Sequence, residues 1–145
     1  MSVLPQKERC KVDNNRYEEI FICFKRNSTK VWHKLLDDEF GHCFVIIKLR
    51  TGGWMILEPT VHGLDARLPS IPDIDYPMFL KNRLKVRVVK ITQPEKCFAM
   101  ITTPVFGWQS CTMWVKYMLG VRQLWVWTPK QLYNCLMKKY GGVEL

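Results

Sequence analysis

The stretch FGWQSCTMWVKYMLG, residues 106–120, places Cys111 at the expected start of a helix. Apolar side chains recur there at the spacing of one helix face, and Gly120 follows as the residue expected to end the helix. The members of this face are Cys111, Trp114, Val115, Met118 and Leu119. A thiolate at a helix N-terminus is stabilised by the positive end of the helix dipole, and the unpaired N–H groups there can stabilise an oxyanion. Cys111 is therefore a candidate nucleophile, although a buried structural cysteine is the commoner role of such a residue taken alone.

A cysteine nucleophile needs a base within hydrogen-bond reach and a third group that orients this base. His42 and Glu58 lie toward the two ends of GHCFVIIKLRTGGWMILEPT, in which RTGG separates two apolar runs. The glycines supply the positive φ angles of a tight turn, so we expect a β-hairpin. If the turn is centred near Thr51, residue 42 lies across from about residue 60, and Glu58 projects from the same face as His42. A register shift of one residue would separate the two side chains.

Other residues offer alternative roles. His62, in a proline-rich segment, is an alternative base, whereas we expect His33 to lie on the surface or to pack. His42 could equally be a hydrogen-bonded core histidine, and Glu58 could pair with an arginine at a strand end. Cys43 follows His42, but neighbouring residues of a strand point to opposite faces, so we expect Cys43 to pack rather than to assist Cys111.

Strands and helices expected around these residues define the fold class. Gathered β-branched and aromatic residues predict strands at 17–24, 42–49, 54–57, 97–103 and 124–127. RLKVRVV (83–89) alternates, which predicts a half-buried strand whose other face is a row of cations: Lys81, Arg83, Lys85 and Arg87. The proline-rich segment 59–77 has no sustained period and is expected to be a long surface loop.

A second helix is expected within TPKQLYNCLMKKYGG, residues 128–142. Thr128 is its expected N-cap, Pro129 its first residue and Gln131 the partner in a capping box, with Gly141 after its end. The whole chain is therefore expected to be one α+β domain, residues 1–145, with a mostly antiparallel sheet packed against the core helix that carries Cys111. Residues 1–15 are polar and are expected to be flexible.

Composition narrows the classes of function. The chain has 145 residues and a net charge of +9, which favours encounter with acidic partners. No recognised nucleic-acid motif or exposed aromatic pattern accompanies this charge, so nucleic-acid binding is not favoured. The six cysteines form no C-x-x-C pair, and we expect neither a metal nor a cofactor. The sequence has no signal peptide and no apolar run long enough to span a membrane, so we expect a cytoplasmic protein without membrane contact.

The order and surroundings of these residues resemble the papain-like cysteine peptidase superfamily. GHCFVIIKLRTGGWMILEPT resembles the His strand and following acidic strand of transglutaminase-like members, where the phrase gW..lDPT is common; here Glu58 replaces the Asp. Those families run Cys, His, then Asp or Asn, whereas this chain runs His42, Glu58, Cys111. That order resembles the circularly permuted NlpC/P60-like branch. A late C..W.K..LG helix followed by TP.QLY also resembles phage-encoded members, which would place the protein in host cytoplasm or a virion.

The resemblance implies a thiol hydrolase of peptide, isopeptide or other amide bonds, or an acyl transferase, working through a covalent thioester. In this scheme Cys111 attacks the acyl carbon, His42 takes and returns the proton, and Glu58 holds the imidazole. The backbone N–H of Cys111 contributes to the oxyanion hole, with Gln109 as a second donor. Trp108 lies just before Cys111 and is a candidate wall of the substrate cleft.

Two further readings of the sequence remain open. The chain could be a non-catalytic structural or interaction protein of the same fold, for example one that contacts other proteins of a phage particle, in which case Cys111 would be inert or distant from His42. It could also be a basic nucleic-acid-binding domain, whose affinity would fall steeply with salt.

Overall fold

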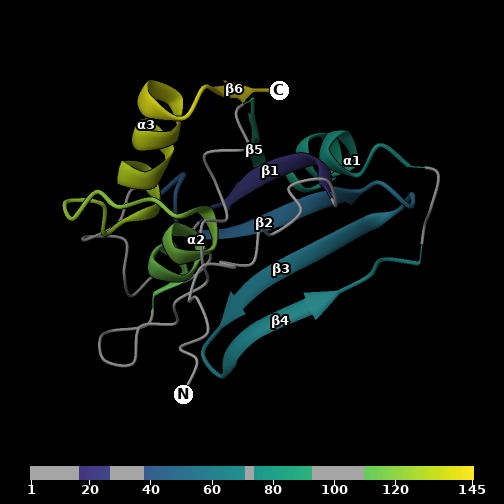
Figure 1. Ribbon diagram of the computed structural model, residues 1–145, viewed down its shortest axis with the longest axis horizontal. Helices are drawn as coiled ribbons and strands as arrows, with labels where there is room; N and C mark the ends of the chain where they lie inside the picture. The colour runs from purple at the N-terminus through teal and green to yellow at the C-terminus, as the bar shows by residue number, and fades with distance from the viewer. Residues whose placement is uncertain (1–16, 27–37, 71–73, 93–109) are drawn as a thin grey trace, which may run out of the picture.

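The computed structural model describes residues 17–26, 38–70, 74–92 and 110–145. Six strands form one antiparallel sheet in the order β4-β3-β2-β1-β5-β6 (Figure 1). The strands are β1 (Tyr17–Lys25), β2 (His42–Leu49), β3 (Trp54–Thr60), β4 (Gly63–Arg67), β5 (Arg87–Ile91) and β6 (Gly142–Glu144). The helices are α1 (Tyr76–Leu84), α2 (Cys111–Leu119) and α3 (Pro129–Lys139). The expected α+β class with an antiparallel sheet is confirmed.

Helices cover both faces of the central strands. Ile20, Ile22 and Phe24 of β1 are buried in a cluster with residues of α2 and α3, while Phe21 and Cys23 are buried in a second cluster with α1. Burial of both faces explains why IFICF (residues 20–24) is apolar at successive positions and does not alternate with polar residues. Each side chain fully buried in this way contributes about 1.5–3 kcal/mol to folding.

Helix α2 begins at Cys111, as expected. The Ser110 hydroxyl accepts a hydrogen bond from the Met113 N–H (3.2 Å), and Gly120 ends the helix in the left-handed conformation (φ 68°). The predicted apolar face packs on the sheet, with Val115, Met118 and Leu119 buried and Cys111 and Trp114 packed against the same cluster. The cap therefore fixes Cys111 as the first residue of the helix.

The β2–β3 hairpin also has the expected register. Gly52 and Gly53 adopt φ angles of 85° and 88°, and Val45 lies across from Leu57. Continued to the strand ends, this register places residue 42 across from residue 60, so the geometry expected for His42 and Glu58 is confirmed.

The segment 59–77 is not a long surface loop. Strand β3 continues to Thr60, and after a short turn the chain returns as β4. The Thr60 hydroxyl donates to the Gly63 carbonyl (3.0 Å) inside this turn, and Gly63 has a φ of 133°. Pro59 lies beyond the β2–β3 pairs, which run from Trp54 to Leu57, so its missing N–H removes no bond from those pairs.

The predicted cationic strand face is wrong. Lys81 and Arg83 belong to α1, which begins where the Asp75 carboxylate accepts from the Met78 N–H (3.3 Å). The helix ends at Lys85, whose φ of 54° is left-handed, and only Arg87 lies on a strand, β5. The alternation of cationic and apolar residues therefore runs across the end of a helix and the start of a strand and does not mark a single strand.

Residues 124–127 are not a strand either; they form a turn between α2 and α3. Val126 is buried there, and its carbonyl accepts a hydrogen bond from the buried Lys116 ammonium (3.0 Å). The expected strand at 97–103 and the expected flexible segment 1–15 lie outside the described residues.

Helix α3 shows the expected capping box. The Thr128 hydroxyl accepts from the Gln131 N–H (3.3 Å), and the Gln131 side chain accepts from the Thr128 N–H (3.1 Å). Leu132 and Leu136 of this helix are buried in the core cluster. Cys135 is buried with them.

Removal of the cap should weaken the whole fold, because α3 supplies core residues. We expect Thr128→Ala to lower the free energy of unfolding by about 1 kcal/mol. Urea denaturation followed by circular dichroism would measure the change. Asn134→Ala, at an exposed position of the same helix, is the matched control and should change stability by at most about 0.5 kcal/mol. An equal loss in both variants would contradict a role for the cap.

Candidate active site

The three candidate residues meet at the end of the sheet where β2 begins. The Cys111 sulfur hydrogen-bonds with the His42 side chain, and the His42 Nε2 lies 3.4 Å from a carboxylate oxygen of Glu58. A pocket of about 330 Å³ opens at this point, lined by His42, Pro59, Thr60, Val61 and Cys111. Cys111 and His42 thus border one hollow in the described surface, and Glu58 lies beside the His42 imidazole.

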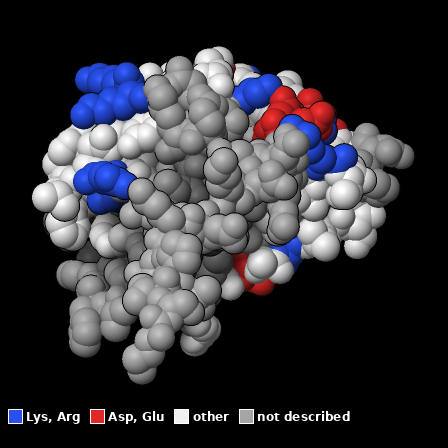
Figure 2. All heavy atoms as spheres, in the orientation of Figure 1, with Lys and Arg blue, Asp and Glu red and all other residues white. Residues whose placement is uncertain are grey.

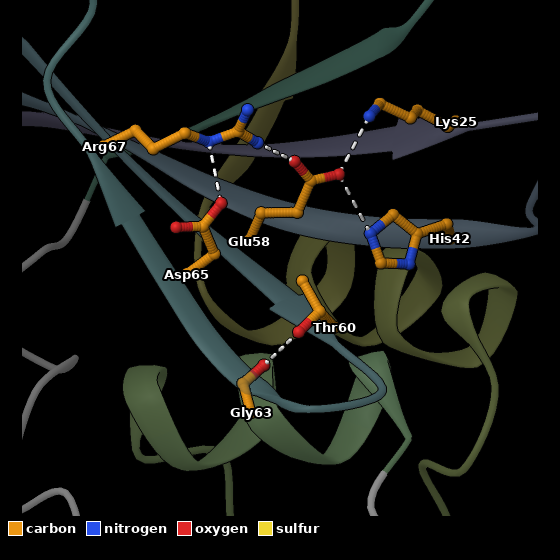
Figure 3. Close-up of polar contacts among 7 residues, drawn as sticks. All are labelled: Lys25, His42, Glu58, Thr60, Gly63, Asp65 and Arg67. Atoms are coloured by element: carbon orange, nitrogen blue, oxygen red, sulfur yellow. Dashed lines mark hydrogen bonds and ion pairs between the residues drawn. The ribbon is translucent and has the colours of Figure 1, made fainter.

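Two cations hold the Glu58 carboxylate in place (Figure 3). Lys25 Nζ lies 2.9 Å from the same oxygen that faces His42, and Arg67 pairs with the other oxygen. Arg67 also pairs with Asp65 (3.0 Å). Side chains from β1, β2 and β4 therefore hold the Glu58 carboxylate, and one of its oxygens faces the His42 imidazole.

Strand alternation puts these charged residues on the α1 side of the sheet. His42 and Glu58 have the parity of Phe44 and Ile56, which are buried against α1, and Lys25 is the β1 partner of His42. Cys111 approaches from the α2 side. His42 can touch both because it is the first residue of β2, where no further strand backbone separates the two faces. Since Nε2 faces Glu58, Nδ1 is the nitrogen left for Cys111.

Hydrogen bonds stabilise the thiolate form of Cys111 and lower its pKa to about 4. The largest contribution comes from the Cys43 thiol, which donates a hydrogen bond to the Cys111 sulfur. Burial opposes this effect, and hydrogen bonds from His42 and from the Cys43 backbone N–H add to it. The dipole of α2, which has no acidic residue in its first turn, acts in the same direction.

The pKa of Glu58 is lowered as well. Burial alone would raise it, but the hydrogen bond and charge of Lys25, together with the charges of His42 and Arg67, outweigh the burial. Glu58 is therefore a carboxylate at neutral pH, which is the state able to orient an imidazole.

Cys43 contacts Cys111, although strand alternation alone predicts that it only packs. Its side chain does point away from the face of His42, as expected, but α2 packs on that other face and brings Cys111 to it. Neighbouring positions of β2 thus contact Cys111 from two directions. The adjacent His42 and Cys43 are visible in the sequence, but their shared contact with Cys111 depends on where α2 packs, which the sequence alone does not give.

The remaining candidates are not brought to Cys111 by the described structure. His62 is exposed in the β3–β4 turn, where its backbone N–H donates to the Thr60 hydroxyl (3.3 Å), and it does not line the pocket. Trp108, Gln109 and His33 lie outside the described residues, so the oxyanion and cleft roles of the first two stay predictions.

Other surface features point less clearly to chemistry. A larger pocket of about 540 Å³ lies on the α1 side and includes Trp54, Lys48 and Asp75, but neither a cysteine nor a histidine lines it. The described residues contain no group of three or more His, Cys, Asp or Glu side chains placed to hold a metal ion. On the face shown in Figure 2, the described Lys and Arg side chains lie in separate groups, one of them interspersed with acidic residues.

No helix in the described part of the chain has the length and apolar character needed to cross a membrane.

Comparison with known proteins gives no match: no family model, no curated protein and no solved structure matches this chain. The function must therefore be argued from the geometry of the site.

The site predicts selective alkylation of Cys111. Iodoacetamide should label Cys111 at a nearly constant rate from about pH 5 to pH 8, because the thiolate is the reactive form and is already present. In His42→Ala the rate at low pH should fall, since one donor to the sulfur is lost. Mass spectrometry of the Cys111 peptide, in both proteins and over this pH range, would give the two profiles.

His62→Ala is the matched control, because it removes an exposed histidine outside the pocket, and its profile should equal that of the wild type. A wild-type labelling rate that rises tenfold per pH unit up to about pH 8.5 would mean an ordinary thiol.

Proposed function

We propose that this protein is a small thiol hydrolase, or an acyl transferase with the same intermediate, that acts on peptide or other amide bonds through Cys111, His42 and Glu58. The observation that carries the proposal is the position of the His42 imidazole, which contacts both the Cys111 sulfur and the Glu58 carboxylate. Each of the three residues has an ordinary structural use, but Cys111 and His42 line one pocket and Glu58 contacts His42, which supports a shared chemical role.

The first step would form a thioester. The Cys111 thiolate attacks the acyl carbon of the substrate, and its electron pair forms the S–C bond while the carbonyl oxygen becomes an oxyanion. Protonated His42 then gives its proton to the leaving amine as the C–N bond breaks. Glu58 stabilises the imidazolium during this transfer and keeps the ring oriented.

The second step would regenerate the thiolate. Neutral His42 removes a proton from water, and the resulting hydroxide attacks the thioester carbon. The C–S bond breaks, the acid leaves, and the proton stays on His42 for the next cycle. An amine in place of water would give acyl transfer instead.

The N-terminus of α2 supplies the expected oxyanion donors. The first N–H groups of a helix have no acceptor within the helix, and those of Cys111 and Thr112 are in this position. Gln109 as an additional donor remains a prediction, as does Trp108 as a wall of the cleft.

The relation to permuted papain-like hydrolases is part of the proposal. An antiparallel sheet that carries the histidine and carboxylate, with the nucleophile opening a helix packed against it, agrees with that arrangement. The NlpC/P60-like branch, a phage origin and a cytoplasmic or virion location rest on the resemblance of short motifs alone.

One observation favours a non-catalytic alternative. Glu58 already pairs with Lys25 and Arg67, which is also how a purely structural carboxylate at the end of a sheet would be held. In that case the protein would serve as an interaction module, for example among the proteins of a phage particle. The test below separates the two.

Hydrolysis should require all three residues. A library of peptide amides with a fluorogenic leaving group would supply the substrates, and a peptidyl vinyl sulfone would report the nucleophile. We expect Cys111→Ala to abolish both turnover and labelling, and His42→Ala to lower kcat/KM by about 10²–10⁴-fold. The acid limb of the wild-type pH profile should lie near the Cys111 pKa of about 4.

Asp65→Asn is the matched control for Glu58→Gln, because Asp65 shares Arg67 with Glu58 but does not contact His42. Glu58→Gln should reduce kcat/KM, whereas Asp65→Asn should leave it within about twofold, as expected for an exposed ion pair. A wild-type protein that neither turns over any amide nor reacts with the sulfone would refute the hydrolase and favour the interaction module.

A further inference from the structure

Cys43 and Cys111 form a pair of thiols in direct contact. Cys43 lies on β2 and is completely buried, and its thiol donates a hydrogen bond to the Cys111 sulfur. Cys111 is partly exposed at the pocket and packs against the cluster that contains Cys43. One sulfur of the pair therefore lies at a pocket open to small reagents, while the other has no exposed surface.

The two sulfurs are also chemically unlike. Several hydrogen-bond donors hold Cys111 as a thiolate, whereas burial raises the pKa of Cys43 and keeps it protonated. Hydroperoxides react with thiolates and not with thiols, so they would oxidise Cys111 first. The Cys43 thiol, which lies beside the oxidised Cys111 sulfur, can then attack that sulfur and form a disulfide.

We propose that Cys43 is a resolving thiol that closes a reversible disulfide with Cys111 after a hydroperoxide has oxidised Cys111. In the first step, the Cys111 thiolate attacks the peroxide oxygen, the O–O bond breaks, and a sulfenic acid forms as the peroxide is reduced to water or an alcohol. In the second step, the Cys43 sulfur attacks the sulfenic sulfur, the S–S bond forms, and the thiol proton leaves with the hydroxyl group as water.

The disulfide would switch off the proposed nucleophile and protect it from irreversible oxidation. A disulfide bond is about 2.05 Å long, and the Cys43 and Cys111 sulfurs that would form it already lie side by side. The inference rests on the proposed function in taking Cys111 as the reactive thiol. It does not require the protein to hydrolyse any substrate.

Cys23 is a built-in comparison. It is buried like Cys43 and lies on the neighbouring strand β1, but it belongs to the cluster on the α1 side. Its side chain therefore faces away from α2, and we expect no disulfide between Cys23 and Cys111.

Peptide mapping of the full-length protein after treatment with hydrogen peroxide tests the inference. Cys97 and Cys111 share the tryptic peptide 97–116, so chymotrypsin, which cleaves after Trp108, is needed to separate them. We expect a linked pair of peptides that contain Cys43 and Cys111, lighter by two hydrogen atoms than their sum. Dithiothreitol should remove this link and restore alkylation of Cys111 completely.

Two cysteine variants separate disulfide formation by Cys43 from the initial oxidation of Cys111. In Cys43→Ser the disulfide should be lost, and Cys111 should pass to sulfinic acid, which dithiothreitol does not reverse. Cys23→Ala should give the same linked peptides as the wild type. Wild-type Cys111 that is oxidised to sulfinic acid without a disulfide, that links to another cysteine, or that resists peroxide would overturn the inference.

The outcomes also distinguish this inference from the proposed function. An inactive protein that forms the Cys43–Cys111 disulfide would leave the inference standing and refute the hydrolase. An active hydrolase whose oxidised Cys111 never links to Cys43 would do the reverse.

Discussion

Strand alternation sends His42 and Cys43 to opposite faces of the sheet, yet both side chains reach the sulfur of Cys111. This is possible only at the end of a strand, where an imidazole can extend past the backbone while the next side chain points at the helix. The β2–β3 register then decides which residue stands beside the imidazole. A shift by one position would turn Glu58 from the α1 side to the α2 side of the sheet and leave His42 beside an apolar residue.

The two negatively charged groups at the start of β2, the Glu58 carboxylate and the Cys111 thiolate, lie on opposite faces of the sheet. On one side, Lys25 and Arg67 compensate the charge of Glu58, so the carboxylate stays ionised although it is partly buried. On the other side, the thiolate of Cys111 depends on hydrogen bonds from β2 and on the start of α2. Among the described residues, His42 is the one that contacts both groups, so it couples the Glu58 carboxylate to the Cys111 sulfur.

Features set by neighbouring residues were predictable from sequence. The end of α2 at Gly120, the capping box at Thr128 and the glycine turn of the β2–β3 hairpin each follow from a few adjacent side chains. Features set by tertiary packing were not. The alternation around Lys85 suggested one strand, but a helix ends there and a new strand begins. The role of Cys43 was missed because alternation gives the face of a side chain and not what packs on that face.

The turn between β3 and β4 forms one wall of the pocket without belonging to a packed layer. Val61 is 94% exposed there, and Thr60 is held by hydrogen bonds within the turn itself. Residues at this turn can be exchanged or added at little cost to the core, whereas changes at His42 or Glu58 disturb the sheet. Selectivity at the pocket can thus diverge rapidly among descendants of this chain while its reactive groups stay fixed.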